Sequence, residues 1–544
     1  MDIPSLFMIP SAVSSGKVHS VFPNSTDADF DFNRDSDATR VNSEGLIERV
    51  GYYGSELITN GDFATDSNWT KGSGWSISNG VAISSGIQTG NSNFYQVVYT
   101  TSKVYNTRLK VIAINGTLRV FTGTGAASLT ITEVGDYEVL DKLADSSTVL
   151  YLQVTAGTTV TIDNVSVKEV LGDRARLNYE IEGGLVNTKP SLLLEPQSTN
   201  IVTYSEDFSQ SYWTKSNTTI NVNQSTSPDG TLNADSIVSS TTNSVHFLRH
   251  TFVAVSANTP HTYSFFIKAN GYTKFGVRDN AQTGAYLTYD LETESIINSA
   301  SMTVVVNKLK DDWFKCSFTS TIGSNGVAGY AFYLLDDSYT TGYLNTYSYT
   351  GDGVSGFYIY GFQLEQQSYA TSYIPTNGST QTRAAETCNG AGTSSILPSE
   401  EGILYAEIAA LVTGGENRVI TISDGSYNNS TRIQLYTNTN EIEMRTVVGG
   451  AIQALERVAI SNTLDFNKIA YKYKANDFQL YVNGSKLRFD TNGSVSAAGT
   501  YNKINFDDGG GNADFYGKIR DIRVYNTKEM TDSEVDILLT KITS

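Results

Sequence analysis

A phrase of fifteen residues occurs twice in this chain. Residues 57–71 read LITNGDFATDSNWTK, and residues 201–215 read IVTYSEDFSQSYWTK. Both contain an apolar pair, an acidic residue followed by Phe, and a closing Trp-Thr-Lys. A phrase that returns after a long stretch of unlike residues indicates two copies of one domain rather than a short-period solenoid. We expect the Phe and Trp side chains to plug the end of a β-sandwich where its first strand begins.

The composition is typical of an all-β protein with several domains. A chain of 544 residues is too long for one core and predicts three or four units. Only 17% of the residues are charged, while 11% are aromatic and Ser, Thr, Asn and Tyr are abundant. Such a composition favours strands with polar faces and turn-rich loops, and it contains too many aromatic and β-branched residues for disorder.

The charge balance and the N-terminus exclude several classes of partner. The net charge is −18, and binding to nucleic-acid phosphates needs a Lys/Arg surface, so we expect no nucleic-acid partner. Residues 1–20 lack the basic start of a signal peptide, and no apolar run is long enough for a membrane helix. We expect a protein made in the cytoplasm that leaves the cell, if it works outside, as part of a particle. Cys316 and Cys388 are too few for a disulfide framework, and whether they pair stays open.

The patterns along the chain predict six segments. They are a segment without regular pattern (1–55), the first repeat copy (56–170), a connector (171–199), the second copy (200–376), a second connector (377–392) and a third sandwich of another kind (393–544). Alternating runs at 158–170 and 357–365 read as the strands that close the two copies. In the third sandwich, Asn483-Gly484 predicts a tight hairpin turn.

A short helix is expected at the end of the chain. Thr531 and Glu534 have the spacing of a capping box. Val535, Leu538 and Leu539 follow at positions that share one face of a helix.

Several of these phrases resemble known families. LITNGDF with NWT, closed by IDNVSVKEV (162–170), resembles the carbohydrate-binding jelly rolls found beside many glycoside hydrolases. LYVNGSKL and GKIRDIRVYNTKEMTDSEV resemble the end of a laminin-G or concanavalin-like sandwich. The resemblance implies tandem β-sandwiches, two of the jelly-roll kind and one concanavalin-like, behind an N-terminal attachment segment.

A series of three phrases is more specific. ATRVNSEGLIERV (38–50), PSLLLEPQSTNIVTYSEDFSQSYWTK (190–215) and ATSYIPTNGSTQTRAAE (370–386) together are similar to head-fibre, head-spike and tail-fibre proteins of tailed bacteriophages, notably crAss-like and other phages of Bacteroidetes. The resemblance implies a structural protein of the virion, often a homotrimer, with residues 1–55 attached to other virion proteins. It leaves open whether the chain sits on the head or the tail.

The jelly-roll resemblance also implies a structural calcium ion. Jelly rolls of this kind often hold calcium between the NGDF phrase and an acidic residue of the last strand, which here matches Asn60, Asp62 and Asp163. The alternative, that Asp163 only caps a turn, stays open. The second copy has Gly361 and Phe362 where an acidic pair is expected, so calcium is not expected there.

No pattern points to an enzyme. A glycoside hydrolase needs two positioned carboxylates, and only Asp507, Asp508 and Asp514 cluster, in a pattern that reads as an acidic turn or weak cation loop. His246 and His250 are four residues apart in a strand-like region, where that spacing does not favour zinc. A polysaccharide depolymerase is therefore the third hypothesis, after a virion fibre or spike and a glycan-binding adhesin.

Tyrosines crowd residues 330–349. Exposed aromatic rings can stack on sugars, and a Tyr hydroxyl adds a directional hydrogen bond. Tyr339, Tyr343, Tyr347 and Tyr349 are therefore candidates for glycan or subunit contact. The alternative is that these rings pack inside the sandwich or between subunits.

Overall fold

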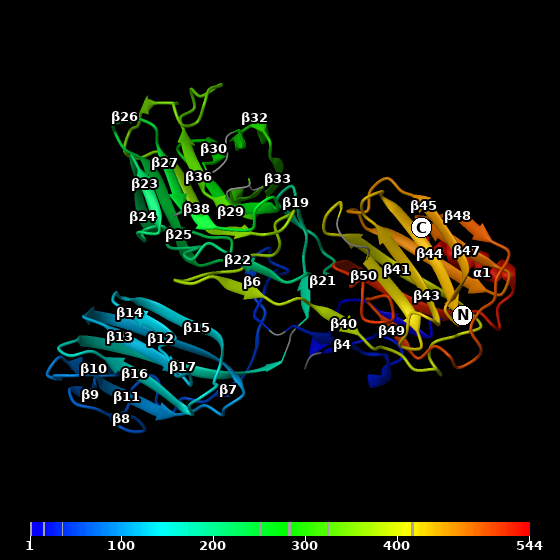
Figure 1. Cartoon of the computed structure of the whole chain (residues 1–544), viewed down its shortest axis with the longest axis horizontal. Helices are drawn as coiled ribbons and strands as arrows, with labels where there is room; N and C mark the ends of the chain where they lie inside the picture. Colours follow the sequence, from blue (N-terminus) through cyan, green and yellow to red (C-terminus); the bar gives the residue numbers. More distant parts are fainter. Residues whose placement is uncertain are drawn as a thin grey trace. The chain divides into compact units, whose positions relative to one another are not determined.

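The computed structural model describes residues 3–14, 17–34, 36–172, 175–250, 252–280, 284–321, 323, 326–414 and 418–544. It divides into two compact units, Gly51–Asp173 and a unit formed by Met1–Val50 with Arg174–Ser544. Nearly all of the regular structure is strand, which confirms the expected all-β fold of tandem β-sandwiches (Figure 1). Among the described residues, no helix has the length and apolar character needed to cross a membrane.

The unit Gly51–Asp173 is a sandwich of two sheets. One sheet has the order β15 (Gly135–Leu143), β12 (Val104–Asn115), β17 (Thr159–Gly172), β10 (Val81–Ser85) and β9 (Trp75–Ser78), with β7 (Tyr52–Glu56) also paired to β17. The other has the order β14 (Leu129–Ile131), β13 (Leu118–Thr122), β16 (Val149–Val154), β11 (Ser92–Val97) and β8 (Thr70–Lys71). Alternate side chains of β16 are buried, as the alternation in the sequence predicts.

The second repeat copy forms another two-sheet sandwich. One sheet has the order β23 (Trp213–Ser216), β27 (Phe247–His250), β36 (Tyr330–Leu335), β30 (Lys274–Asp279), β31 (Tyr286–Asp290) and β32 (Ser295–Ala300). The other has the order β24 (Thr218–Thr226), β25 (Leu232–Ser239), β38 (Gly356–Glu365), β29 (Pro260–Asn270), β34 (Phe314–Thr321) and β33 (Thr303–Lys308). Short pairs of β26 (Asn243–Ser244) with β37 (Tyr349–Thr350) and of β28 (Val253–Ala254) with β35 (Val327–Ala328), and the 3-10 turn η2 (Lys310–Asp312), lie in its loops.

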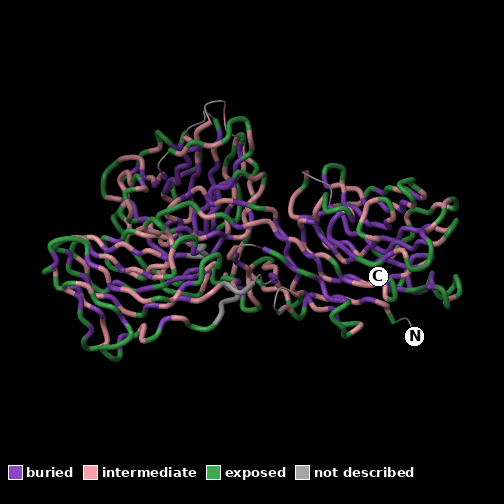
Figure 2. Tube along the Cα trace, turned by 60° about the horizontal axis from the view of Figure 1, so that its bottom comes forward, coloured by how far each residue is buried: buried purple, intermediate pink, exposed green. Residues whose placement is uncertain are grey.

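The third sandwich combines a long sheet with a shorter one. The long sheet has the order β18 (Arg176–Asn178), β21 (Ser191–Leu194), β50 (Gly517–Asn526), β41 (Glu401–Ala410), β46 (Asn467–Lys474), β47 (Phe478–Val482) and β48 (Ser485–Asp490). The shorter sheet has the order β45 (Ala451–Ala459), β44 (Glu441–Val448), β43 (Ser430–Tyr436), β42 (Arg418–Ser423) and β49 (Lys503–Asn505). Figure 2 shows buried segments running along the strands of the sandwiches, with exposed segments mostly in the loops.

Two local predictions for this sandwich are confirmed. Asn483 and Gly484 connect β47 to β48 with positive φ at both residues, which is the geometry of a tight hairpin turn. The helix α1 (Asp532–Thr543) begins at the Thr531–Glu534 capping box and buries Val535, Leu538 and Leu539.

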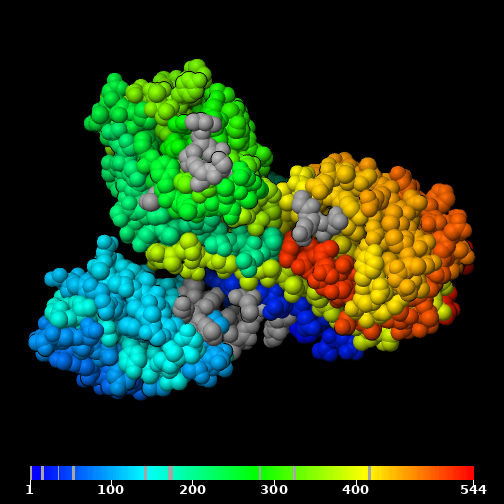
Figure 3. Space-filling model, viewed as in Figure 1, coloured from blue at the N-terminus to red at the C-terminus, as the bar shows by residue number. Residues whose placement is uncertain are grey.

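The N-terminal segment is folded into the third sandwich rather than set apart from it, and its boundary lies at Val50 instead of the expected residue 55. Its strand β1 (Leu6–Met8) pairs with β50, and Leu6, Met8 and Phe30 belong to the core of the third sandwich. In Figure 3 the dark blue atoms of this segment lie against the yellow-to-red third sandwich. The strand β4 (Phe30–Asn33) pairs with β40 (Thr387–Asn389) of the second connector. Residues 51–55 belong instead to the first sandwich.

The connectors are also part of the fold. The first connector supplies β18 and β21 to the long sheet of the third sandwich, so residues 171–199 are not a plain linker. The remaining short elements of this region are β2 (Val13–Ser14), β3 (Lys17–Val18), η1 (Thr26–Ala28), β5 (Thr39–Val41), β6 (Ile47–Arg49), β19 (Ile181–Glu182), β20 (Leu185–Val186), β22 (Ser198–Asn200) and β39 (Gln381–Arg383). Because β22 pairs with β39, the two connectors are hydrogen-bonded to each other.

The repeated phrase has the same geometry in both copies. The indole N–H of Trp69 donates to the carbonyl of Asn60 at 3.0 Å, and that of Trp213 donates to the carbonyl of Tyr204 at 3.1 Å. In both cases the acceptor lies nine positions before the Trp. The Phe of each phrase is buried beside its Trp, with ring centroids 5.6 and 5.2 Å apart. These rings belong to the hydrophobic cores of their sandwiches, as expected for the large apolar residues of the phrase.

Each phrase also docks on its closing strand in the same way. The N–H of Val165 in β17 donates to the carbonyl of Gly61 at 2.9 Å, and the N–H of Phe362 in β38 donates to the carbonyl of Ser205 at 2.9 Å. The residue before each donor is left-handed, Asn164 with φ 53° and Gly361 with φ 63°. This shared kink in the closing strand supports the expectation that the two sandwiches are copies of one domain.

Candidate functional site

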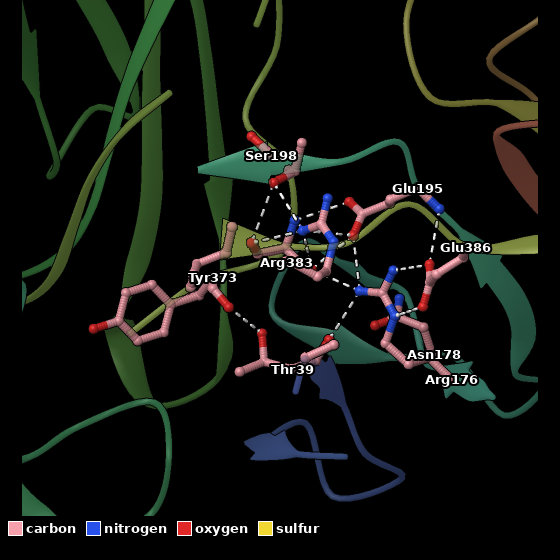
Figure 4. A network of polar contacts seen from close by, with 12 residues as sticks. Thr39, Arg176, Asn178, Glu195, Ser198, Tyr373, Arg383 and Glu386 are labelled. Carbon is pink, nitrogen blue, oxygen red and sulfur yellow. Dashed lines mark hydrogen bonds and ion pairs between the residues drawn. The ribbon is translucent and has the colours of Figure 1, made fainter. Parts of the chain in front are cut away.

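Five charged side chains from distant parts of the sequence meet in a buried network (Figure 4). They are Arg34, Arg176, Arg383, Glu195 and Glu386, and none is more than 4% exposed. Burying a charge is costly unless it is paired and hydrogen-bonded. The segments that carry these charges are therefore stable only in the arrangement that pairs each charge with its partner. We call this set the arginine–glutamate junction.

Glu386 is the centre of the junction. One carboxylate oxygen accepts from Arg34 Nη1 at 2.7 Å and from Arg176 Nε at 2.8 Å. The other accepts from Arg176 Nη2 and from the backbone N–H of Glu195 at 2.9 Å. Burial opposes ionisation of this carboxyl, but the charges of Arg176 and Arg34 outweigh it and hold the pKa of Glu386 below its usual range.

Glu195 joins two arginines to the end of the second sandwich. Its Oε2 lies 2.7 Å from Arg176 Nη1 and 3.2 Å from Arg383 Nη1. The backbone N–H and hydroxyl of Ser372 donate to its two oxygens at 2.9 and 2.7 Å. Burial again opposes ionisation, and Arg383 and Arg176 together lower the pKa of Glu195 well below its usual range.

A third buried carboxyl, Glu365, has the opposite shift. It accepts from Ser198 Oγ at 2.6 Å, from Gln363 Nε2 at 2.6 Å and from the N–H of Thr371 at 3.1 Å. Burial raises its pKa despite these hydrogen bonds. Glu365 ends β38, and Arg383 Nη1 donates to Thr371 Oγ1 at 3.0 Å, so the closing strand of the second sandwich is joined to the junction.

Two of the three phrases that resemble phage fibre proteins supply members of the junction, and the first phrase contacts it; Arg34 and Arg176 lie outside the phrases. Thr39 lies in the first phrase, Glu195 in the second, and Arg383 and Glu386 in the third. The Thr39 hydroxyl donates to the carbonyl of Tyr373, and its own carbonyl accepts from Arg176 at 3.0 Å. Residues of both predicted connectors and of the N-terminal segment therefore form one buried polar centre.

The proposed calcium ligands take part in local turns. Asn60 donates from its side chain to the carbonyls of Thr65 and Ser67 and accepts from the N–H of Thr65 at 3.1 Å. Asp163 accepts from the N–H of Asn164 at 2.7 Å. Asp62 is exposed, and its carboxylate accepts from the N–H of Ala64 at 3.4 Å. These contacts fit turn capping better than a shared ion, and the calcium site stays a prediction.

The tyrosine-rich stretch is mostly packed inside the second sandwich. Tyr339 and Tyr349 are 1% and 8% exposed, and the ring of Tyr347 lies 4.8 Å from that of Tyr339 and 5.7 Å from that of Tyr349. The buried faces of Tyr339 and Tyr349 are not available to a sugar. Tyr343 is 79% exposed and is the member of the set that offers an open ring.

The other candidate residues also have structural roles. Asp507 is 2% exposed and accepts from the N–H of Gly509 at 2.6 Å, while Asp508 accepts from Gly510 and Asn512 in the same loop. Asp514 accepts from the Tyr516 hydroxyl at 3.0 Å. Among the described residues, no group of three or more His, Cys, Asp or Glu side chains could hold a metal ion.

His246, His250 and both cysteines are buried. His246 Nδ1 lies 2.6 Å from the carbonyl of Asn217, and His250 Nε2 accepts from the N–H of Tyr330 at 3.1 Å. Cys316 and Cys388 are buried free thiols in the cores of different sandwiches, so they do not pair.

The third sandwich matches a known family. Residues 406–536 match the model described as the Concanavalin A-like lectin/glucanases superfamily, which confirms the concanavalin-like domain expected there. This match covers less than half of the chain. No curated protein matches the sequence.

Solved structures with low similarity include other β-sandwich proteins. The CBM40 of the Ruminococcus gnavus IT-sialidase bound to α2,3-sialyllactose is 16% identical, with 28% of this chain and 87% of that chain covered and a TM-score of 0.23. Domains LG4-5 of the mouse laminin α1 chain are 11% identical, with 52% and 86% covered and a TM-score of 0.18. At these scores the likeness carries no argument about function.

Proposed function

We propose that this chain is a structural protein of a tailed-phage virion, a head fibre or spike, whose β-sandwiches bind glycans. The observation that carries the proposal is the arginine–glutamate junction. The three phrases that resemble phage fibre proteins are distant in sequence, yet Glu195 of the second and Glu386 of the third belong to this one buried centre, and the Thr39 carbonyl of the first accepts from its Arg176. The phrases that resemble phage fibre proteins therefore meet at one packed centre, which supports that resemblance more than separate surface loops would.

The junction also suits a mechanical role. A buried ion pair is weak evidence for stability, because desolvation offsets much of the attraction, but removing one partner is costly. The network therefore favours one arrangement of the segments that meet in it. A projecting fibre needs such a joint to keep its modules from folding back on a flexible linker.

The glycan-binding part of the proposal rests on the concanavalin-like domain. Its family description includes lectins and glucanases, and the exposed ring of Tyr343 on the second sandwich offers a surface for a sugar. A tail fibre or receptor-binding adhesin is the alternative. A depolymerase is less favoured, because Asp507, Asp508 and Asp514 are engaged in a loop of their own rather than facing each other across a cleft.

Attachment to the particle is proposed through the outer side of the N-terminal segment. Apolar residues of this segment such as Leu6 and Phe30 pack into the core of the third sandwich. In contrast, Ile3, Val21 and Phe22 are 59%, 46% and 44% exposed. Exposed apolar side chains of this size mark contact surfaces when they gather. We propose a homotrimer that meets other virion proteins there.

A map of the assembled particle tests the structural role. We expect density for this chain outside the capsid shell, in three copies around an axis, with residues 3–32 nearest the particle. Absence of the protein from purified virions, together with a monomer in solution, would refute the virion role. A glycan array tests the binding role separately, and an array blank at high protein concentration would refute it.

A further inference from the structure

The shorter sheet of the third sandwich carries an unusual group of arginines on its outer face. Ile433, Leu435, Ile442 and Met444 of β43 and β44 point into the core. Successive side chains of a strand point to opposite faces, so Arg432, Gln434, Glu443 and Arg445 lie on the outer face. We call Arg432, Arg445 and Arg457, with the strands that carry them, the arginine face.

Two of these arginines face each other directly. Arg432 on β43 is the cross-strand partner of Arg445 on β44. Side chains directly opposite each other in an antiparallel pair are close neighbours, and like charges there are destabilising. The fold therefore tolerates a repulsive pair at this position.

One carboxylate serves two of the three arginines. Glu443 is fully buried, and its oxygens lie 2.6 Å from Arg445 Nη2 and 2.8 Å from Arg457 Nε. The Tyr436 hydroxyl donates to it at 3.0 Å. Glu441, two positions before Glu443 on β44, shares this face, so three arginines and two glutamates leave it a local charge of +1 in a chain whose net charge is −18.

Arg432 is attracted by the charge of Glu443 but makes no ion pair with a described residue. It is 4% exposed, and its guanidinium lies 4.7 Å from the centre of the Tyr427 ring. In the described part of the chain no carboxylate lies within ion-pair distance of it. The Nε donors of Arg432 and Arg445 are buried without a hydrogen-bond partner among the described residues. A buried donor left unpaired costs about 1–3 kcal/mol, so two at one place call for an explanation. Burial, with the charge of Arg445, also lowers the pKa of Arg432.

We propose that the arginine face binds the carboxylate or sulfate group of an acidic saccharide. The anion lies against Arg445 and Arg457, whose side chains are 13% and 42% exposed, above the buried charge of Arg432. Arg445 Nη1 and Arg457 Nη2 donate to the hydroxyls of Tyr427 and Tyr436 at 3.2 and 2.8 Å, so the anion is held by the guanidinium charges and by the donors that these contacts leave. A bound anion would also relieve the repulsion between Arg432 and Arg445. This inference rests on the proposed glycan binding and names its ligand class.

Calorimetric titration of the full chain tests the inference. The probes are a sulfated oligosaccharide, an oligouronate and a neutral oligosaccharide of the same length, each at low and high salt. We expect at least one acidic probe to bind and to weaken at high salt, because the contact is ionic. Comparison of the sulfated and uronate probes tells which anion the face prefers.

Single substitutions locate the site. R445Q and R457Q should each weaken acidic-probe binding about tenfold or more, and R432Q should weaken it several-fold. R278Q is the matched control, because it removes one half-buried arginine from β30 of the second sandwich and should change binding less than twofold. The melting temperature of R432Q should equal or exceed that of the wild type, which separates a lost ligand contact from misfolding.

The outcomes separate this inference from the proposed function. Acidic probes that bind R445Q and R432Q as tightly as the wild type would overturn it. Binding of the neutral probe alone would overturn it and leave glycan binding in place. Binding of none of the probes at millimolar concentration overturns the inference, while the glycan array decides the proposed function.

Discussion

Arg176 and Glu386 face each other through two parallel hydrogen bonds across 210 positions of the sequence. Arg176 begins β18 at the edge of the third sandwich, and Glu386 lies just before β40, which pairs with the N-terminal segment. Arg34 donates to the same carboxylate at 2.7 Å. Because this one side chain holds two buried arginines, the junction depends on it more than on any peripheral contact.

Replacing Glu386 should destabilise the unit that contains it. E386Q keeps the shape but leaves Arg34 and Arg176 buried without their shared negative charge. Breaking a buried ion pair in this way costs about 3–5 kcal/mol. Urea denaturation of the full chain measures the free energy of unfolding of this unit.

An exposed pair provides the control for this measurement. Glu294 pairs with Lys308 at the surface, where both side chains are at least one third exposed. E294Q should change stability by less than about 1 kcal/mol. Equal small effects of E386Q and E294Q would contradict the role given to the junction.

A methyl group at Gly61 should disturb the docking of the first phrase. A Cβ added there would lie 2.0 Å from the carbonyl oxygen of Val165 in the closing strand, which is backbone and cannot move aside. Overpacking of this kind costs about 1–3 kcal/mol, and we expect G61A near the upper end. G90A is the control, since nothing lies within 4 Å of its added Cβ. Thermal unfolding gives the melting temperatures of both variants. A G61A melting temperature equal to that of G90A would refute the predicted clash with the closing strand.

The sequence predicted the parts of the fold that depend on residues close together in the chain. The buried Phe63 and Trp69, the alternation of β17 and the Asn483-Gly484 turn each depend on residues that are close together in the chain, and their residue types state the geometry directly. The second occurrence of the phrase predicted the same buried Phe and Trp independently in the second sandwich.

The junction could not be predicted in the same way. Strand β1 is only Leu6–Met8, and it pairs with residues near Val524, so it has neither a period nor a nearby partner to show it. Arg34 and Glu386 are 352 positions apart. The one local signal was Glu195 directly after the fully buried strand β21, because a charge placed beside such a strand needs a partner. The arginine face was missed because its residues alternate with core residues and look like an ordinary polar strand face.

The predicted calcium site has a direct test. If calcium bridges the NGDF phrase and β17, a chelator should lower the melting temperature of the first sandwich, and added calcium should restore it. D62N and D163N should each abolish that response. A melting temperature that does not move with chelator would remove the site and leave Asn60, Asp62 and Asp163 as turn residues.

Asp235 should make the stability of the second sandwich depend on pH. This carboxyl is 2% exposed in β25 and accepts from the N–H of Phe208, the Phe of the second phrase, at 3.1 Å and from that of Asn223 at 3.0 Å. Burial raises its pKa from the ordinary 3.8 to about 6. The folded protein therefore holds this proton more tightly than the unfolded chain does. Its stabilising effect is complete below pH 3.8 and is lost as the pH rises through 6.

The variant D235N isolates this effect because its side chain does not titrate. Between about pH 4 and 6.5, the wild type should lose about 3 kcal/mol of unfolding free energy relative to D235N, from a shift of about two pKa units. Urea denaturation at several pH values gives the two curves. D465N, which alters an exposed loop carboxylate, should follow the wild-type curve. If the unfolding free energies of D235N and the wild type change in parallel over this range, the protonation of Asp235 does not make the stability of the second sandwich depend on pH.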